Sequence, residues 1–228
     1  DIVANLNVAI IPGAGARHGD NMSVNLDDSG NGYIFFGDNA ASKILRLTVT
    51  NYTQIGNPFV FSAPPTPTGV TPSAWTSYNR VGNSEEYIYT GHDIPIFVMN
   101  SSGSIAYAMA RTSIPIRGSD ARVFYFNEER YLMMLTAART APESVMYVYN
   151  ITKGSTLEEA LAIFETETDR KPVFEYSLLG SQNGNPTTQT GFYVKKDAQG
   201  KDESLLLYGS SFNAGFVLIE IPKNELDD

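Results

Sequence analysis

The chain has 228 residues, and its 16 lysines and arginines stand against 25 aspartates and glutamates, a formal net charge of −9 at pH 7. A nucleic-acid surface needs clustered basic residues to displace counterions, so this balance argues against nucleic acid as a partner. No cysteine is present, which excludes disulfides and thiolate chemistry, and two histidines are too few for a multi-histidine zinc site.

Short runs rich in Val, Ile, Tyr and Phe recur along the chain, separated by turns of Gly, Asn, Asp or Pro, which is the pattern of β-strands. A strand, a turn, a second hydrophobic strand, a polar loop and a β-branched third strand form a unit that appears four times. In chain order the predicted strands are 23–27, 33–36, 43–49 and 59–61; 74–78, 86–89, 96–99 and 105–109; 122–126, 130–135, 144–149 and 173–178; and 191–195, 204–208 and 216–221.

One helix is predicted, over residues 155–164, with Ser155 or Thr156 as its cap and Glu158 and Glu159 in its first turn. No run of 18 apolar residues occurs, so we expect no membrane-spanning segment. The chain begins at Asp1 without a methionine or a signal sequence, so we expect a mature or excised part of a longer protein.

Four-stranded units repeating at roughly 40–50 residues are typical of propeller blades. The sequence therefore predicts one all-β domain over residues 1–228, a β-propeller of four blades, or of five if two have been merged. The helix is an insertion in it. The last unit lacks a fourth strand, and residues 2–11 could supply it and close the ring, which would remove an exposed sheet edge. A β-sandwich or two small β domains are the alternatives.

Residues 32–39 (GYIFFGDN) with 43–47 (KILRL), and 205–209 with 216–221, carry a resemblance to the propeller-type domains of surface lipoproteins from gut Bacteroidetes, many of them of unknown function. This resemblance covers nearly the whole chain. It implies an exported domain in a glycan-utilisation context, at the cell surface or outside the cell. It assigns no residue roles.

In a propeller, the loops from second to third strands and the loops between blades share one face around the central channel, and function is commonly carried by such loops. We therefore predict a ligand-binding face at these loops, where an aromatic ring can stack on a sugar while Asp, Asn and Arg bind its hydroxyls. Its candidate residues are Arg17, His18, Asp38, Asn39, Trp75, His92, Asp93, Arg117, Arg139 and Asn213.

The predicted function is a non-catalytic binding module that engages a glycan or a partner surface protein through this face, as a monomer or as part of a longer chain. A carbohydrate-active hydrolase or lyase using a carboxylate or a histidine of the same pocket is one alternative. A structural spacer within a larger surface protein is another. Residues 27–32 lack the spacing of a calcium loop, and neither a metal nor another cofactor is predicted.

Overall fold

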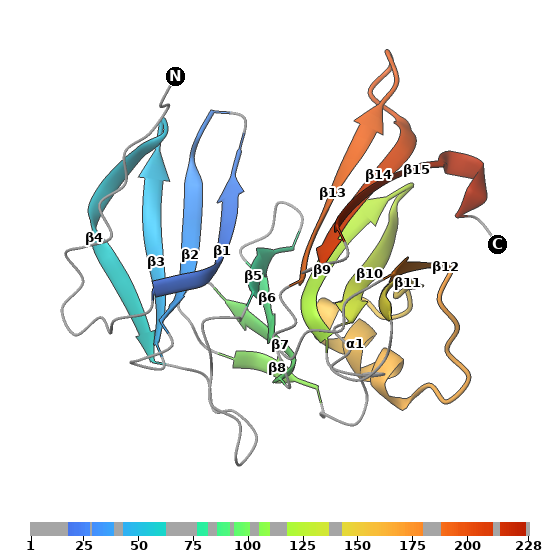
Figure 1. Ribbon diagram of the computed structural model, residues 1–228, viewed down its shortest axis with the longest axis horizontal. Coiled ribbons are helices and arrows are strands. Elements are labelled where there is room, and N and C mark those ends of the chain that lie inside the picture. Colours follow the sequence, from blue (N-terminus) through green and yellow to red (C-terminus); the bar gives the residue numbers. More distant parts are fainter. Residues whose placement is uncertain are drawn as a thin grey trace.

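The computed structural model describes residues 18–27, 29–38, 43–62, 77–81, 86–91, 94–100, 105–109, 118–136, 143–179, 188–211 and 215–226. These residues form four small antiparallel sheets, each of which follows the order of the chain. The four sheets lie as the blades of a propeller, so the protein is a four-bladed β-propeller (Figure 1).

The first blade holds β1 (His18–Leu26), β2 (Gly32–Asp38), β3 (Lys43–Thr50) and β4 (Thr53–Ser62). The second holds β5 (Ser77–Arg80), β6 (Glu86–Gly91), β7 (Ile94–Asn100) and β8 (Ile105–Ala108). The third holds β9 (Gly118–Phe126), β10 (Glu129–Thr136), β11 (Glu143–Asn150) and β12 (Phe174–Leu179). The fourth holds β13 (Thr188–Lys196), β14 (Asp202–Ser211) and β15 (Gly215–Pro222), which a short 3-10 turn, Lys223–Glu225, follows.

These strands confirm the predicted four-unit repeat, but the first strands of three blades, β1, β9 and β13, begin earlier than predicted. The ladder of β1 already pairs His18 with Asp38, and that of β9 pairs Gly118 with Thr136. His18, predicted to lie in a loop, is therefore the first residue of a strand. The polar and glycine-rich starts of these strands, such as Gly19-Asp20 and Gly118-Ser119-Asp120, lack the apolar alternation that marks a strand in sequence. Residues 2–11, predicted to close the ring, lie outside the described residues.

The third blade is buried on both of its faces. Leu132 and Met134 of β10 pack with Ile88 and Val98 of the second blade, whereas Met133 and Leu135 pack with residues of the fourth blade such as Leu205 and Leu207. Successive residues of a strand point to opposite faces, so an unbroken apolar run is what two buried faces require. The run from Tyr131 to Leu135 meets this requirement, since none of its side chains is more than 1% exposed.

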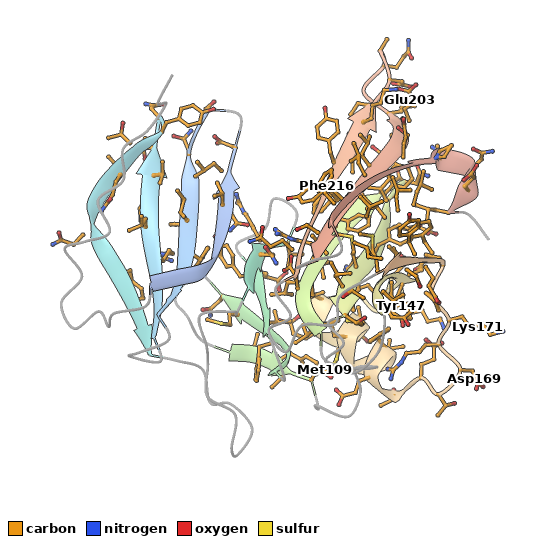
Figure 2. The ribbon with its side chains drawn as sticks, viewed as in Figure 1. Met109, Tyr147, Asp169, Lys171, Glu203 and Phe216 are labelled. Carbon is orange, nitrogen blue, oxygen red and sulfur yellow. The ribbon has the colours of Figure 1, made fainter. Side chains whose placement is uncertain are left out.

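Aromatic rings fill much of the space between the blades. Phe124 stacks on Phe192 of the fourth blade with ring centroids 4.8 Å apart, and Figure 2 shows the side chains crowded between these two blades. Phe35 of the first blade packs on Tyr87 of the second at 4.9 Å. Burial of each such side chain contributes roughly 1.5–3 kcal/mol. Packing of this kind holds a chain that has no disulfide.

The predicted helix is present as α1 (Leu157–Thr166), displaced by two residues from its expected start. Thr156 is the cap: its hydroxyl accepts a hydrogen bond from the Glu159 backbone N–H at 3.1 Å. Glu159 in turn accepts bonds from the backbone N–H and the hydroxyl of Ser155, both at 2.8 Å. The buried face of the helix, Leu157, Ala160, Leu161 and Phe164, joins the core between the second and third blades.

Candidate functional site

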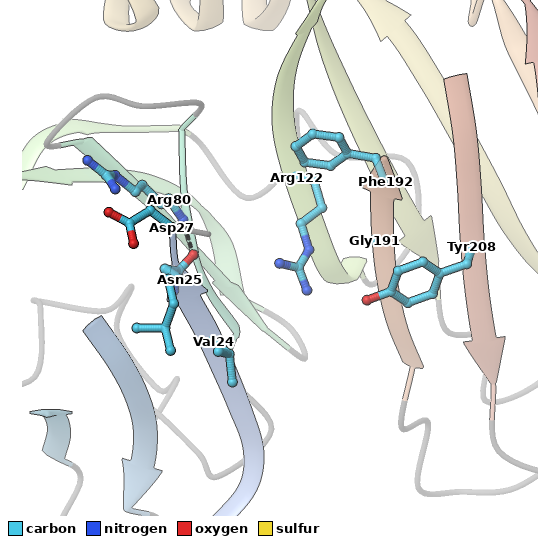
Figure 3. A pocket seen from close by; sticks show the side chains of 9 residues that line it. Val24, Asn25, Asp27, Arg80, Arg122, Gly191, Phe192 and Tyr208 are labelled. Atoms are coloured by element: carbon cyan, nitrogen blue, oxygen red, sulfur yellow. Dashed lines mark hydrogen bonds between the residues drawn. The ribbon is translucent and has the colours of Figure 1, made fainter. Parts of the chain in front are cut away.

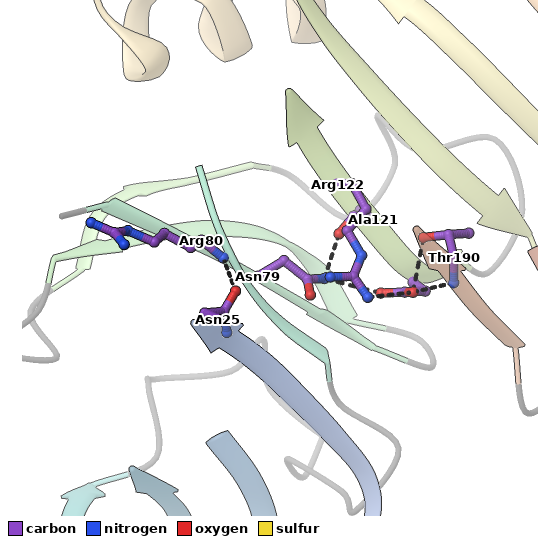
Figure 4. Close-up of polar contacts among 7 residues, drawn as sticks. Asn25, Asn79, Arg80, Ala121, Arg122 and Thr190 are labelled. Carbon is purple, nitrogen blue, oxygen red and sulfur yellow. Dashed lines mark hydrogen bonds and ion pairs between the residues drawn. The ribbon is translucent and has the colours of Figure 1, made fainter. Parts of the chain in front are cut away.

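The first strands of the blades, β1, β5, β9 and β13, carry polar side chains that bond across the centre of the propeller. Asp120 on β9 is 1% exposed and is the hub of this network. Its Oδ1 accepts a hydrogen bond from Nδ2 of Asn79 on β5 at 3.1 Å. Its Oδ2 accepts two from Thr190 on β13, from the backbone N–H at 2.6 Å and from the hydroxyl at 2.9 Å. One carboxylate thus joins three blades (Figure 4).

The network reaches the first blade through Asn25 on β1. Oδ1 of Asn25 accepts a hydrogen bond from the Arg80 backbone N–H at 2.8 Å, and Arg80 is the neighbour of Asn79 on β5. Asn79 also donates to the carbonyl oxygen of Ala121 at 2.6 Å. These hydrogen bonds set how β1, β5, β9 and β13 are positioned relative to one another along their lengths.

A cavity of about 350 Å³ adjoins this network and takes its lining from all four blades (Figure 3). The lining residues are Val24, Asn25, Leu26, Asp27, Arg80, Arg122, Gly191, Phe192 and Tyr208. Small-molecule sites typically measure roughly 300–1,000 Å³, so the space suits a small ligand or one unit of a longer one.

Arg122 and Tyr208 present their polar ends to this cavity. Figure 3 shows the guanidinium of Arg122 and the hydroxyl of Tyr208 projecting into the same space, opposite Val24 and Asn25. An amino group of Arg122 lies 3.6 Å from Oδ2 of Asp120, which holds the side chain from behind. Nε of Arg122 and Nδ2 of Asn25 are buried and have no hydrogen-bond partner among the described residues. A buried donor without a hydrogen-bond partner lowers the stability of the fold, so these two donors call for an acceptor that the described residues do not supply.

Asp27 is the one carboxylate among the described residues that line this cavity, and hydrogen bonds within its own turn already engage it. Its Oδ1 accepts the backbone N–H groups of Asn31 and Ser29, at 2.8 and 2.9 Å. The hydrogen bond from the Asn31 backbone is the main reason why the pKa of Asp27 is lowered, and the charge of Arg80 adds to it. The carboxylate is therefore ionised at neutral pH and committed to the β1–β2 turn.

The glycine opposite Tyr208 in the β13–β14 ladder positions the tyrosine ring. A methyl group at Gly191 would lie 2.0 Å from ring atoms of Tyr208, because the ring rests directly over the glycine backbone. The two residues are directly opposite one another in the β13–β14 ladder. Glycine at this position lets the ring lie flat and aims its hydroxyl at the cavity.

A family model and a solved structure identify the same family. A family model described as "Domain of unknown function (DUF4623)" matches residues 1–224. The chain belongs to the DUF4623 family. The crystal structure of a DUF4623 family protein from Bacteroides eggerthii DSM 20697 superposes with a TM-score of 0.83 at 38% identity, over 97% of this chain and 50% of that one. The chain thus spans about half the length of that relative.

Two further comparisons add nothing on function. A prolyl oligopeptidase B from Galerina marginata, bound to a 35mer substrate, matches at 13% identity and a TM-score of 0.34, over 83% of this chain and 23% of that one, which is too weak to carry an argument. No curated protein matches the chain.

Two of the ten residues predicted from the sequence of this DUF4623 chain, His18 and Asp38, lie within the described residues. They face each other in the β1–β2 ladder, although the structure describes only their backbone. The other eight predicted residues lie outside the described residues: Arg17, Asn39, Trp75, His92, Asp93, Arg117, Arg139 and Asn213. Their role as a binding face stays a prediction.

The cavity lies on the other side of the polar network from this pair of residues. Arg122 and Phe192 come two residues after Asp120 and Thr190, in the direction in which β9 and β13 run towards their turns. Asp27 belongs to the corresponding turn of the first blade. The cavity therefore opens towards the turns between first and second strands, whereas the paired residues His18 and Asp38 lie at the opposite end of β1 and β2.

The sequence prediction for this DUF4623 chain did not include Asn25, Arg80, Arg122 or Tyr208. No local signal marked them: the segments around Asn25, Asn79, Asp120 and Thr190 are polar, so these residues do not stand out in the sequence.

Within the described ranges, no helix has the length and apolar character needed to cross a membrane. Nor do the described residues gather three or more His, Cys, Asp or Glu side chains in a position to hold a metal ion.

Proposed function

We propose that this DUF4623 chain is a non-catalytic binding module of a bacterial cell-surface protein, and that its central cavity takes the anionic group of an acidic saccharide. The observation that carries the proposal is the guanidinium of Arg122, which projects into a cavity built by all four blades while its Nε lacks a partner among the described residues. Hydrogen bonds between an ionised donor and a carboxylate are the strong ones, and arginine presents them in a fixed fork.

The remaining lining fits a sugar around that anionic group. The Tyr208 hydroxyl and the Asn25 amide can bond to hydroxyl groups, and Phe192 and Val24 offer apolar surface for a ring face. Two carboxylates flank the scissile bond in most glycoside hydrolases, whereas the described lining holds one carboxylate, Asp27, which is engaged in its turn. The residues of the cavity therefore favour binding over hydrolysis.

Exchanging Arg122 for glutamine should weaken binding of a uronic-acid oligosaccharide at least tenfold, because the lost charge-assisted hydrogen bonds are worth about 1.5–3 kcal/mol. Isothermal titration with oligogalacturonate, and with a neutral oligosaccharide of the same length, measures this loss. Lys171→Gln is the matched control, because it removes the same charge from an exposed position.

A Trp75→Ala variant separates this cavity from the loop face predicted by the sequence. The proposal expects binding in Trp75→Ala and its loss in Arg122→Gln. The reverse pattern would move the site to the loop face. Absence of binding by the unchanged protein to acidic saccharides would overturn the saccharide assignment.

A further inference from the structure

A second hollow lies between the tips of the third and fourth blades. It measures about 680 Å³ and is lined by Tyr125, Asn127, Glu128, Lys196, Gly200, Lys201, Asp202 and Lys223. We call it the tip groove. Its lining comes from the β9–β10 turn, from the β13–β14 turn with the strand residues beside it, and from the 3-10 turn after β15.

The tip groove is positively charged on a chain whose net charge is −9. Among the described residues that line it, three are lysines and two, Asp202 and Glu128, carry carboxylates. Asp202 is already engaged, because Lys196 forms an ion pair with it and the Asn127 backbone N–H donates to its Oδ2 at 2.6 Å. Lys201 and Lys223 form no ion pair with a carboxylate of the described residues.

Lysines on a surface are ordinarily solvated and do not by themselves indicate a site. The wall of the groove also contains the side-chain amide of Asn127, which has no hydrogen-bond partner among the described residues. Both Nδ2 and Oδ1 of Asn127 are buried, and neither has a hydrogen-bond partner among the described residues. An unpaired buried polar group costs about 1–3 kcal/mol, and such a group in a folded protein calls for a reason. A ligand group that enters the groove could pair with the amide.

The turn that carries Asn127 is fixed in place. Asn127 and Glu128 both have positive φ, 52° and 66°, as the two central residues of a tight type I′ hairpin turn require. The bond from the Asn127 backbone to Asp202 ties this turn to the fourth blade. Burial would raise the pKa of Asp202, but hydrogen bonds from Lys196 and from the Asn127 N–H outweigh it and lower the pKa. The carboxylate therefore stays ionised and keeps the tie at neutral pH.

We propose that the tip groove is a second binding site, for an oxyanion group, with Lys201, Lys223 and the Asn127 amide as its donors. The shared chemistry of its ligands is a sulfate, phosphate or carboxylate group, which accepts several hydrogen bonds and pairs with ammonium groups. The site is independent of the central cavity, since none of its lining residues lines that cavity.

A titration of the ¹⁵N-labelled chain with sodium sulfate, at an ionic strength held constant with chloride, tests the proposal. Amide signals of residues 127, 128, 196–202 and 223 should shift and saturate, and chloride alone should not reproduce the shifts. Parallel titrations with phosphate, with acetate, and with a sulfated oligosaccharide and its desulfated counterpart distinguish the sources of the anion.

The double variant Lys201→Gln/Lys223→Gln should weaken sulfate binding at least tenfold. Lys153→Gln/Lys171→Gln, which removes the same charge near the helix, should leave it unchanged. Shifts that do not saturate, or that persist in the Lys201/Lys223 variant, would overturn the proposal.

Asn127→Gly separates binding from folding at the turn. Glycine accepts the positive φ and removes the unpaired amide, so the variant should be at least as stable as the original chain and yet bind sulfate more weakly. Unchanged sulfate affinity in this variant would remove Asn127 from the site.

Discussion

Replacing Asp120 with alanine should lower the free energy of unfolding by about 3–5 kcal/mol, the cost expected when one partner of a buried, hydrogen-bonded charge is removed. The change strips two hydrogen bonds from Thr190 and one from Asn79, and it leaves Arg122 without its ion-pair partner. Urea denaturation, which gives both the midpoint and its slope, measures the loss.

Two variants calibrate this result. Asp120→Asn keeps one acceptor oxygen and the side-chain shape, so its loss should be intermediate. Glu167→Ala breaks the exposed Lys153–Glu167 pair, whose atoms lie 2.7 Å apart, and should cost no more than about 1 kcal/mol. If Asp120→Ala costs no more than Glu167→Ala, the polar network does not hold the blades together.

Gly32→Ala should cost about 2–3 kcal/mol, because the change strains the backbone and creates a clash at the same time. Gly32 has φ +144°, and a methyl group there would lie 2.1 Å from the carbonyl oxygen of Asn25. The clash is with backbone, so the β1–β2 pair itself must shift. Since Asn25 lines the central cavity, ligand affinity should fall as well.

Gly56→Ala is the matched control for that change. Gly56 also has a positive φ, +69°, but a methyl group there would meet nothing within 4 Å. Its cost should be about 1 kcal/mol, that of the left-handed backbone alone. Thermal or urea unfolding of both variants compares the two, and equal losses would show that the contact with Asn25 is not what constrains Gly32.

The sequence was sufficient to predict the propeller because its signal is local and repeated. Apolar runs such as residues 33–36, 86–89 and 130–135 recur near blade spacing, and the structure places β2, β6 and β10 there. The helix could be predicted for the same reason, because its capping residues, Thr156 and Glu159, are near neighbours in the sequence.

The centre of the propeller could not be predicted in the same way. Asn79 and Asp120 are 41 residues apart, and Asp120 and Thr190 are 70 apart. No local pattern shows that three such residues will share hydrogen bonds. Asp120-Ala121-Arg122 has the composition of a turn, and it becomes the wall of a cavity only because β5 and β13 lie on either side of β9.

The third blade, which is buried on both faces, should be the last part of the molecule to open. Amide hydrogens of β10 should exchange with solvent only through global unfolding, because both faces of the strand lie in the two large apolar clusters. The buried cluster described in the first blade is smaller, built on Ile34, Leu47 and Val49, so this blade should open at a lower free energy. A ligand in the central cavity would touch β1 of the first blade and Arg122 of the third blade together. Occupancy should therefore slow amide exchange most in the first blade, because the ligand links this blade to the more stable third blade.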